Sequence, residues 1–357
     1  MKKQKYIKEG KKYIQQGNLN AAIIELRNAL QIDPNDAEAS YNLGSCYLMA
    51  GKFDNALDAL KKAIENSPDL LPARLDKASI HLLKNQLKES QDEIEYVLKM
   101  DPNNGKAYNL RASIQRFRGN YKGAFHDFRK SIALEPKSLE PRLNLAKLYA
   151  LSRNYEGAKK EIDKILLIDP KSLQAKLMQA ELYEGENMMD EAAREFEVII
   201  SQSPKKPEGY VGLGNIYLKQ QKITEVINLA HTMLEKNPEL HIAKLFLGIA
   251  AIREGKFKDA VSNLQEAVKY FPQSSQSHYN LGVAYYASDN FQMATSEYLK
   301  ALEIEPKNVS ILTTLAITYL EKEWYTDALS YCGKVFDISP NNRIAQYIQE
   351  MARLRKY

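Results

Sequence analysis

Apolar residues recur along this chain at the spacing of one helix face, in short stretches that are separated by turn-forming residues. One example is the series Ala21, Ile24, Leu26, Ala29 and Leu30. This spacing is typical of an amphipathic helix that buries one side. We therefore predict an all-α protein built from short helices of roughly three to four turns each.

The prolines reveal an internal repeat. Ten of the thirteen prolines follow one another at intervals of 34 residues. They are Pro34, Pro68, Pro102, Pro136, Pro170, Pro204, Pro238, Pro272, Pro306 and Pro340. A fixed period of this length indicates a repeat architecture in which each unit is one supersecondary element.

Other positions recur when this proline is numbered 32 in each repeat. Position 8 holds Gly or Ala in every repeat, position 11 holds Tyr in seven, and position 20 holds Ala in eight. Small residues let two helix backbones approach closely, and the tyrosine fills the layer beside them. Gly17, Gly51, Gly119 and Gly255 share position 15, where they predict the end of a first helix. Each unit is therefore predicted to be a helix, a short turn and a second helix.

This pattern resembles the tetratricopeptide repeat. The resemblance covers residues 3–342 and implies a right-handed α-solenoid in which the first helix of each pair lines the concave side. The ten repeats begin at residues 3, 37, 71, 105, 139, 173, 207, 241, 275 and 309. The sequence departs from the family at position 4, where an aromatic residue is usual and Arg74, Arg142, Lys176 and Lys244 stand instead.

A single helix pair of this kind cannot bury its apolar face, so stability must come from stacking on neighbouring pairs. We therefore predict one continuous solenoid. Residues 343–357 are predicted to form a capping helix. Its expected apolar stripe consists of Ile344, Tyr347, Ile348, Met351 and Leu354.

Composition and motifs exclude several classes of function. The formal net charge of +5 over 357 residues is nearly neutral, which argues against a dedicated nucleic-acid binder. No stretch of the sequence approaches the ~18 apolar residues of a membrane span. The five histidines fall at unrelated repeat positions, and Cys46 and Cys332 are expected to be buried packing residues. We therefore predict no catalytic, cofactor-binding or metal-binding residues, and no enzyme activity.

The resemblance places the ligand-binding surface on the first helices. The predicted groove residues are Asn42, Asn144, Val211, Leu218, Ile242, Leu245, Phe246, Ile249, Tyr279, Asn280, Val283 and Tyr286. Part of this set must serve packing between repeats, and the remainder suits an extended or helical peptide. In the family, an Asn at position 6 often bonds the backbone of a bound peptide, which is the role that the resemblance implies for Asn42, Asn144 and Asn280. The groove of repeats 1–5 is expected to be more polar.

The leading hypothesis is a scaffold that binds a peptide or partner protein in this groove. The alternatives are a self-assembling structural protein, a targeting module of a larger enzyme or secretion complex, and a groove that binds polysaccharide. Repeat one also resembles bacterial envelope tetratricopeptide proteins linked to exopolysaccharide export and protein sorting. The compartment stays open: cytoplasmic for the sequence as given, and periplasmic or lipid-anchored if a signal sequence was removed.

Overall fold

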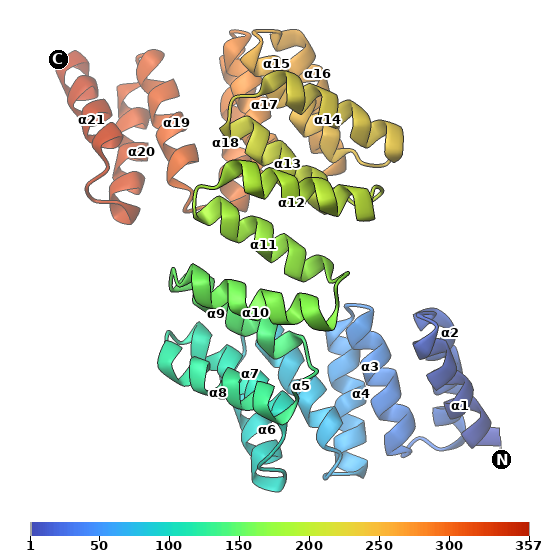
Figure 1. Ribbon diagram of the computed structural model, residues 1–357. Coiled ribbons are helices and arrows are strands. Elements are labelled where there is room, and N and C mark those ends of the chain that lie inside the picture. The colour runs from blue at the N-terminus through green and yellow to red at the C-terminus, as the bar shows by residue number, and fades with distance from the viewer. Residues whose placement is uncertain (1, 357) are drawn as a thin grey trace. The chain divides into compact units, whose positions relative to one another are not determined.

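The computed structural model describes residues 2–356 and the side chains of residues 2–354. Within this range every regular element is an α-helix, and the helices follow one another in antiparallel pairs (Figure 1). The helices are α1 (Lys2–Gln15), α2 (Leu19–Ile32), α3 (Ala37–Met49), α4 (Phe53–Asn66), α5 (Leu71–Leu83), α6 (Leu87–Met100), α7 (Gly105–Phe117), α8 (Tyr121–Leu134), α9 (Glu140–Leu151), α10 (Tyr155–Ile168), α11 (Leu173–Gly185), α12 (Met189–Gln202), α13 (Pro207–Lys219), α14 (Ile223–Lys236), α15 (Ile242–Arg253), α16 (Phe257–Tyr270), α17 (Ser275–Ala287), α18 (Phe291–Ile304), α19 (Val309–Glu321), α20 (Tyr325–Ile338) and α21 (Arg343–Lys356). The chain is therefore an α-solenoid of tandem helix pairs.

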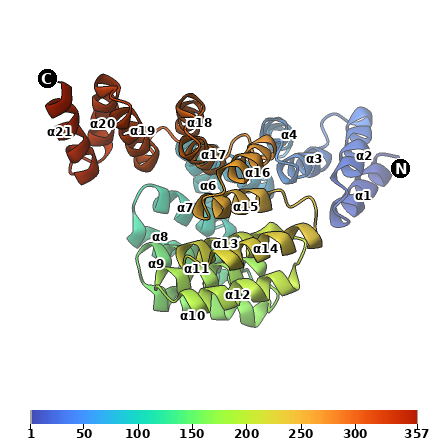
Figure 2. The same cartoon turned by 90° about the horizontal axis from the view of Figure 1, so that it is seen from above.

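The helices group into two compact units, an N-terminal unit that ends at Met178 and a C-terminal unit that begins at Gln179. In the N-terminal unit the odd-numbered first helices contact their neighbours, α3 with α5, α5 with α7, and α7 with α9. In the C-terminal unit α13 contacts α15, and α15 contacts α17. Figure 2 shows α19, α20 and α21 side by side at the end of the C-terminal unit. Each unit thus presents a face made by successive first helices.

Small residues at position 8 bring the two helices of a pair together. A Cβ atom added to Gly44 of α3 would lie 2.7 Å from Cγ of Leu60 on α4. A Cβ atom added to Gly282 of α17 would lie 2.5 Å from Cε1 of Tyr298 on α18. Both large side chains are buried against the glycine backbone. The packing between first and second helices therefore depends on the missing side chain, as the sequence predicts.

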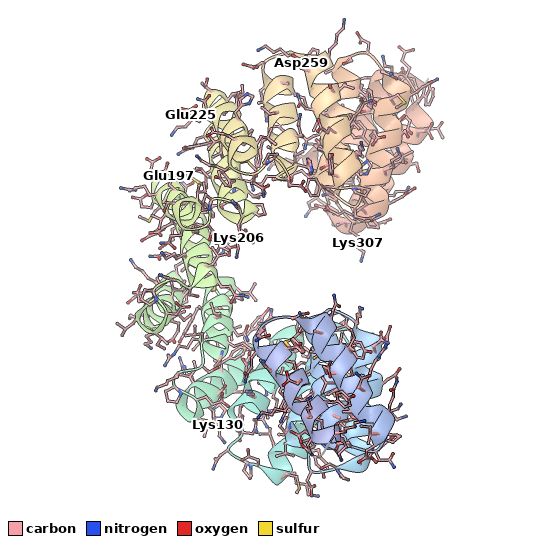
Figure 3. The ribbon with its side chains drawn as sticks, turned by 90° about the vertical axis from the view of Figure 1, so that its right-hand side faces the viewer. Lys130, Glu197, Lys206, Glu225, Asp259 and Lys307 are labelled. Atoms are coloured by element: carbon pink, nitrogen blue, oxygen red, sulfur yellow. The ribbon has the colours of Figure 1, made fainter. Side chains whose placement is uncertain are left out.

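Every first helix from α1 to α19 ends in the same backbone conformation. The residue at position 15 has a positive φ in each case, whether it is glycine or not. These residues are Gly17, Gly51, Asn85, Gly119, Arg153, Asn187, Gln221, Gly255, Asp289 and Glu323. The left-handed residue lets the chain reverse directly after the first helix. Figure 3 shows the consequence of these reversals in the C-terminal unit. Asp259 lies just after such a turn, Lys307 lies between two helix pairs, and the two residues are at opposite ends of the helices.

Several position-4 residues, both tyrosines and departures from an aromatic residue, make the same contact. In five repeats the side chain at this position donates to the carbonyl oxygen of the preceding position-32 proline. The atom pairs are Arg74 Nε and Pro68 O (3.0 Å), Tyr108 Oη and Pro102 O (3.1 Å), Arg142 Nη2 and Pro136 O (3.3 Å), Tyr210 Oη and Pro204 O (3.1 Å), and His278 Nε2 and Pro272 O (3.1 Å). Tyr, Arg and His all carry a polar hydrogen at the end of a long side chain. A long side chain with a hydrogen-bond donor at position 4 can therefore bind the proline carbonyl, and this contact does not require an aromatic ring.

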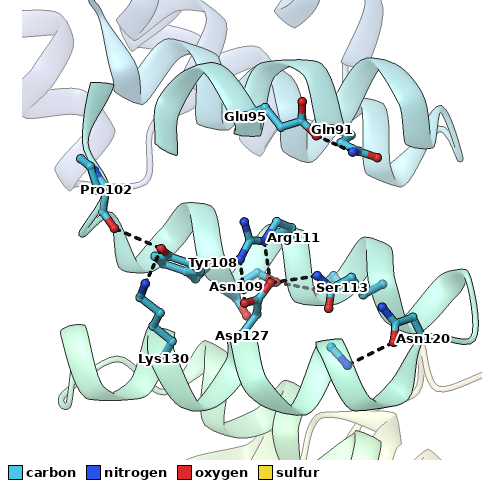
Figure 4. A network of polar contacts seen from close by, with 12 residues as sticks. Gln91, Glu95, Pro102, Tyr108, Asn109, Arg111, Ser113, Asn120, Asp127 and Lys130 are labelled. Carbon is cyan, nitrogen blue, oxygen red and sulfur yellow. Dashed lines mark hydrogen bonds and ion pairs between the residues drawn. The ribbon is translucent and has the colours of Figure 1, made fainter. Parts of the chain in front are cut away.

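Buried ion pairs tie the first and second helices of several pairs together. Figure 4 shows Arg111 of α7 facing Asp127 of α8. The guanidinium donates from Nε to Oδ2 at 2.6 Å and from Nη2 to Oδ1 at 2.8 Å. Asp127 is buried, and Gln115 donates a further hydrogen bond to it at 3.0 Å. A bidentate pair of this kind fixes the orientation of the two helices more strongly than a single contact.

The apolar stripe predicted for the terminal helix is only partly correct. In α21, Ile348 is buried together with Ala345 and Ala352, and this face packs on α19 and α20. Ile344, Tyr347 and Leu354, which the prediction placed in the same stripe, are exposed. The two alanines carry the packing because small residues let α21 approach its neighbours closely. Tyr357 lies outside the described residues.

Candidate protein-binding surface

Three of the predicted groove residues belong to the core of the C-terminal unit. Leu245, Phe246 and Ile249 of α15 are buried. The ring of Phe246 packs on the backbone of α13, because a Cβ atom added to Gly214 would lie 2.6 Å from its Cε1 atom. The prediction that these side chains line a ligand surface is therefore corrected. They hold neighbouring first helices together.

The other apolar groove residues of this unit lie at the edge of the core and stay accessible. Six half-buried side chains on α13, α15 and α17 pack on the buried clusters and leave the rest of their surface to solvent. They are Val211, Leu218, Ile242, Tyr279, Val283 and Tyr286. They occupy positions 2, 5, 9 and 12 of three successive first helices, and we call this set the apolar strip. It is the part of the predicted groove that a ligand can reach.

The apolar strip continues onto α19, where the exposed Ile317 occupies the same repeat position as Val283, and it ends at a cavity. Tyr279 Oη lies 3.2 Å from Thr314 Oγ1, which links α17 to α19. A cavity of about 190 Å³ opens here, lined by Ser275, Gln276, Tyr279, Glu305, Asn308, Ser310 and Ile311. This volume is below the ~300 Å³ of a typical small-molecule site. It suits one side chain of a bound segment better than a cofactor.

The three position-6 asparagines do not come together in one site. Asn42 of α3 and Asn280 of α17 each donate to a backbone carbonyl of their own helix, to Glu38 O at 2.7 Å and to Gln276 O at 2.8 Å. Asn144 of α9 instead donates to Asn109 Oδ1 of α7 at 3.0 Å. The first two thus keep a side-chain oxygen as an acceptor, whereas Asn144 contributes to packing between neighbouring first helices.

The first-helix face of the N-terminal unit has a polar cavity and an electrostatically unusual carboxyl group. The cavity, of about 260 Å³, is lined in part by Tyr41, Asp76 and Lys106. Burial raises the pKa of the Asp76 carboxyl, although Ser45 Oγ donates to it at 2.7 Å. This agrees with the polar groove that the sequence predicts for repeats 1–5. A buried carboxylate with one neutral donor is costly to ionise.

Sequence reasoning missed a second apolar surface on the N-terminal unit. Met49, Leu83, Phe117 and Leu151 are exposed, and each is the last residue of a first helix. The signal was present in the sequence, because the four residues are spaced at intervals of 34. Their exposure could not be read from it, since an apolar residue type does not by itself show whether the side chain is buried or exposed.

Both cysteines and His278 are buried in the described part of the chain. Burial raises the pKa of the Cys46 thiol to about 11 and also raises that of Cys332, so both stay protonated and unreactive. His278 is buried, with Nδ1 at 2.6 Å from Glu297 Oε2. Within the described part of the chain, no group of three or more His, Cys, Asp or Glu side chains could hold a metal ion. No helix in that part is both long and apolar enough to cross a membrane.

Comparison with known proteins agrees with this architecture. Sequence profiles described as tetratricopeptide or TPR repeats match residues 10–51, 37–70, 118–182, 245–309 and 297–330, which together cover more than half of the chain. The chain belongs to the tetratricopeptide repeat family. No curated protein sequence matches it.

Two solved structures share the fold. The crystal structure of yeast Tom70 aligns over 99% of this chain and 88% of that chain, with 16% identity and a TM-score of 0.52. A tetratricopeptide repeat protein from Parabacteroides merdae aligns over 70% of this chain and 98% of that chain, with 20% identity and a TM-score of 0.53. At these identities the likeness concerns the fold alone.

Proposed function

We propose that this protein is a non-catalytic scaffold that binds a segment of a partner protein on the apolar strip of the C-terminal unit. Membership of a family of protein-interaction repeats supports the general role. The observation that carries the specific surface is the strip itself, because contiguous accessible apolar side chains on a folded protein tend to mark interaction sites. The two buried thiols are not placed to act as nucleophiles on a ligand of this surface.

Within this proposal, residues 3–342 supply the ten repeats and the helix that begins at residue 343 covers the last of them. Tyr279 and Tyr286 are the expected anchors, since aromatic residues contribute disproportionately to binding energy at interfaces. Asn280 offers its free oxygen to a backbone amide of the bound segment. The envelope role that the resemblance of repeat one implies stays a prediction.

A matched pair of substitutions tests the strip. Ile317 of α19 lies one turn beyond Thr314 and is 38% exposed, whereas Leu299 of the second helix α18 is 37% exposed. Partners are recovered by crosslinking pull-down, purified, and titrated against the wild type, Ile317→Asp and Leu299→Asp. We expect Ile317→Asp to weaken binding about tenfold or more, because a charge would then be buried at the interface, and Leu299→Asp to have no effect. Equal affinities for both variants would exclude the strip.

Self-association is a second candidate, favoured by one observation. Ile344, Tyr347 and Leu354 are exposed on α21, and accessible apolar side chains tend to mark interaction sites. If two copies meet there, sedimentation velocity should show association that rises with concentration, and Tyr347→Lys should abolish it. A sedimentation coefficient that stays constant with concentration would dismiss this candidate.

A further inference from the structure

The exposed residues at the ends of the first helices form a regular apolar row on the N-terminal unit. Met49, Leu83, Phe117 and Leu151 are 53%, 65%, 55% and 57% exposed, and they terminate α3, α5, α7 and α9. These four helices contact one another in sequence. The four side chains therefore lie at the same level on neighbouring helices. We call this set the apolar row.

The apolar row is specific to this unit. The equivalent positions of the C-terminal unit hold Gly185, Lys219, Arg253, Ala287 and Glu321. A general requirement of the repeat would have preserved large apolar residues there too. Because the row occupies four consecutive repeats and contributes little to the core, it is better explained by a binding role than by folding.

The border of the row is positively charged. The five-residue segments 48–52, 82–86, 116–120 and 150–154, which contain the row and the turns after it, hold Lys52, Lys84, Arg116, Arg118 and Arg153 and no Asp or Glu. Among the described residues, only Lys84 of these five forms an ion pair, with the highly exposed Asp54 at 2.7 Å. Of the other four, Arg118 donates from Nη1 to Gln91 Oε1 at 2.6 Å, and the Arg116 guanidinium lies 4.6 Å from the centre of the Phe117 ring. These four cations have no carboxylate partner among the described residues, so they can pair with an external one.

A cationic cleft lies beside the end of the row. It has a volume of about 610 Å³ and is lined by Lys122, Phe125, His126, Arg129, Tyr149, Ser152 and Asn154, the last two of which closely follow Leu151 in the chain. Arg129 Nη2 donates to Tyr149 Oη at 2.8 Å, which holds the guanidinium at the cleft. Within the described residues, neither Lys122 nor Arg129 is paired with a carboxylate. Positive charge therefore continues beyond the row.

We propose that the apolar row binds an extended, acidic segment of a partner protein that carries an apolar residue at about every third position. Packed helices lie ~8–10 Å apart. An extended chain in the polyproline II conformation has three residues per turn and advances ~3.1 Å per residue, so every third side chain faces the protein and meets a new first helix. The intervening carboxylates face the cations at the border, and the end of the segment enters the cationic cleft. This surface is separate from the apolar strip, so either assignment stands without the other.

A designed peptide provides the direct test. The probe is a fluorescent peptide of about four Leu-Glu-Glu units, whose three-residue period matches the ~9 Å turn of a polyproline II chain, and the control peptide replaces every Glu with Lys. Fluorescence anisotropy should show binding of the acidic peptide only, and its affinity should fall as NaCl is raised. No binding of the acidic peptide, or equal binding of both peptides, would overturn the proposal.

Variants locate the binding. Leu83→Gln and Phe117→Gln should each weaken the peptide about tenfold or more, whereas Leu167→Gln on α10, where the leucine is 84% exposed, should not. Arg116→Glu should weaken binding and Lys137→Glu should not. Circular dichroism checks that every variant is folded, which is expected because the substituted side chains are largely accessible.

Other occupants give different results and would contradict the proposal. Self-association that Leu83→Gln abolishes would show that a second copy covers the row. Binding to vesicles of anionic lipid that requires Leu83 and Phe117, without binding of the acidic peptide, would identify a membrane surface instead.

Discussion

Two glycines of the C-terminal unit together test the left-handed turn at the end of each first helix. Gly255 has a φ of +75° and would place an added Cβ atom in open space. Gly333 lies inside α20, and its added Cβ atom would also meet nothing within 4 Å. Replacement of either glycine by alanine therefore changes backbone energetics without a steric clash.

The two substitutions should have opposite effects on stability. At Gly255 the left-handed conformation costs an alanine roughly 1–2 kcal/mol, and the lower entropy of the unfolded chain offsets part of that cost. Gly255→Ala should thus lower the free energy of unfolding by about 1 kcal/mol. In a helix interior alanine is preferred over glycine by about 1 kcal/mol, so Gly333→Ala should raise it by a similar amount.

Thermal and urea denaturation, followed by circular dichroism at 222 nm, measure both effects. For a unit of this size about 1 kcal/mol corresponds to roughly 2–4 °C in the melting temperature. Gly248→Ala in the same repeat serves as a comparison in which the substitution does cause a steric clash, because its Cβ atom would lie 2.4 Å from Cγ of Leu264. A Gly255→Ala protein as stable as the wild type would refute the assignment of a strained turn at this position.

Three further predictions concern buried polar groups. Asp127→Ala should destabilise the N-terminal unit by about 1–3 kcal/mol and lower its urea midpoint, because it leaves Arg111 without its buried partner. The control Glu65→Ala removes one partner of an exposed ion pair and should leave the urea midpoint unchanged. The thiol of Cys46, whose pKa burial raises to about 11, should react with a thiol reagent at pH 8 only as fast as the protein unfolds; immediate labelling of the folded protein would contradict its burial. Burial raises the pKa of Asp76 above its ordinary 3.8, so ionisation of this carboxyl destabilises the folded state. Asp76→Asn should therefore be more stable than the wild type at pH 7 and lose that advantage below about pH 3.8. Urea midpoints measured across pH test this, and a stability difference that does not change with pH would rule it out.

The sequence predicts the fold because its signals are local and repeated. Pro34 and its counterparts, the small residue at position 8 and the glycine at position 15 each act within one or two helices. Each repeat offers the same evidence again, so the helix pairs follow without knowledge of distant contacts.

The candidate site is harder to predict, because accessibility depends on neighbouring repeats. Leu245 and Tyr279 share position 5, yet Leu245 is buried and Tyr279 is half-buried. Phe246 is buried because Gly214 in the preceding repeat leaves room for its ring. The apolar row could not be predicted either, because nothing in the local sequence distinguishes an exposed Leu83 from a packed one.

The measurement that tests the central claim most directly is site-specific photocrosslinking within a bound complex. A benzophenone amino acid is placed at residue 317 on the first-helix face or at residue 299 on a second helix, two positions of matched exposure. The account predicts that the partner crosslinks from residue 317 and not from residue 299. Crosslinks from residue 299 alone would show that partners bind the second helices, and the proposed binding surface would then be wrong.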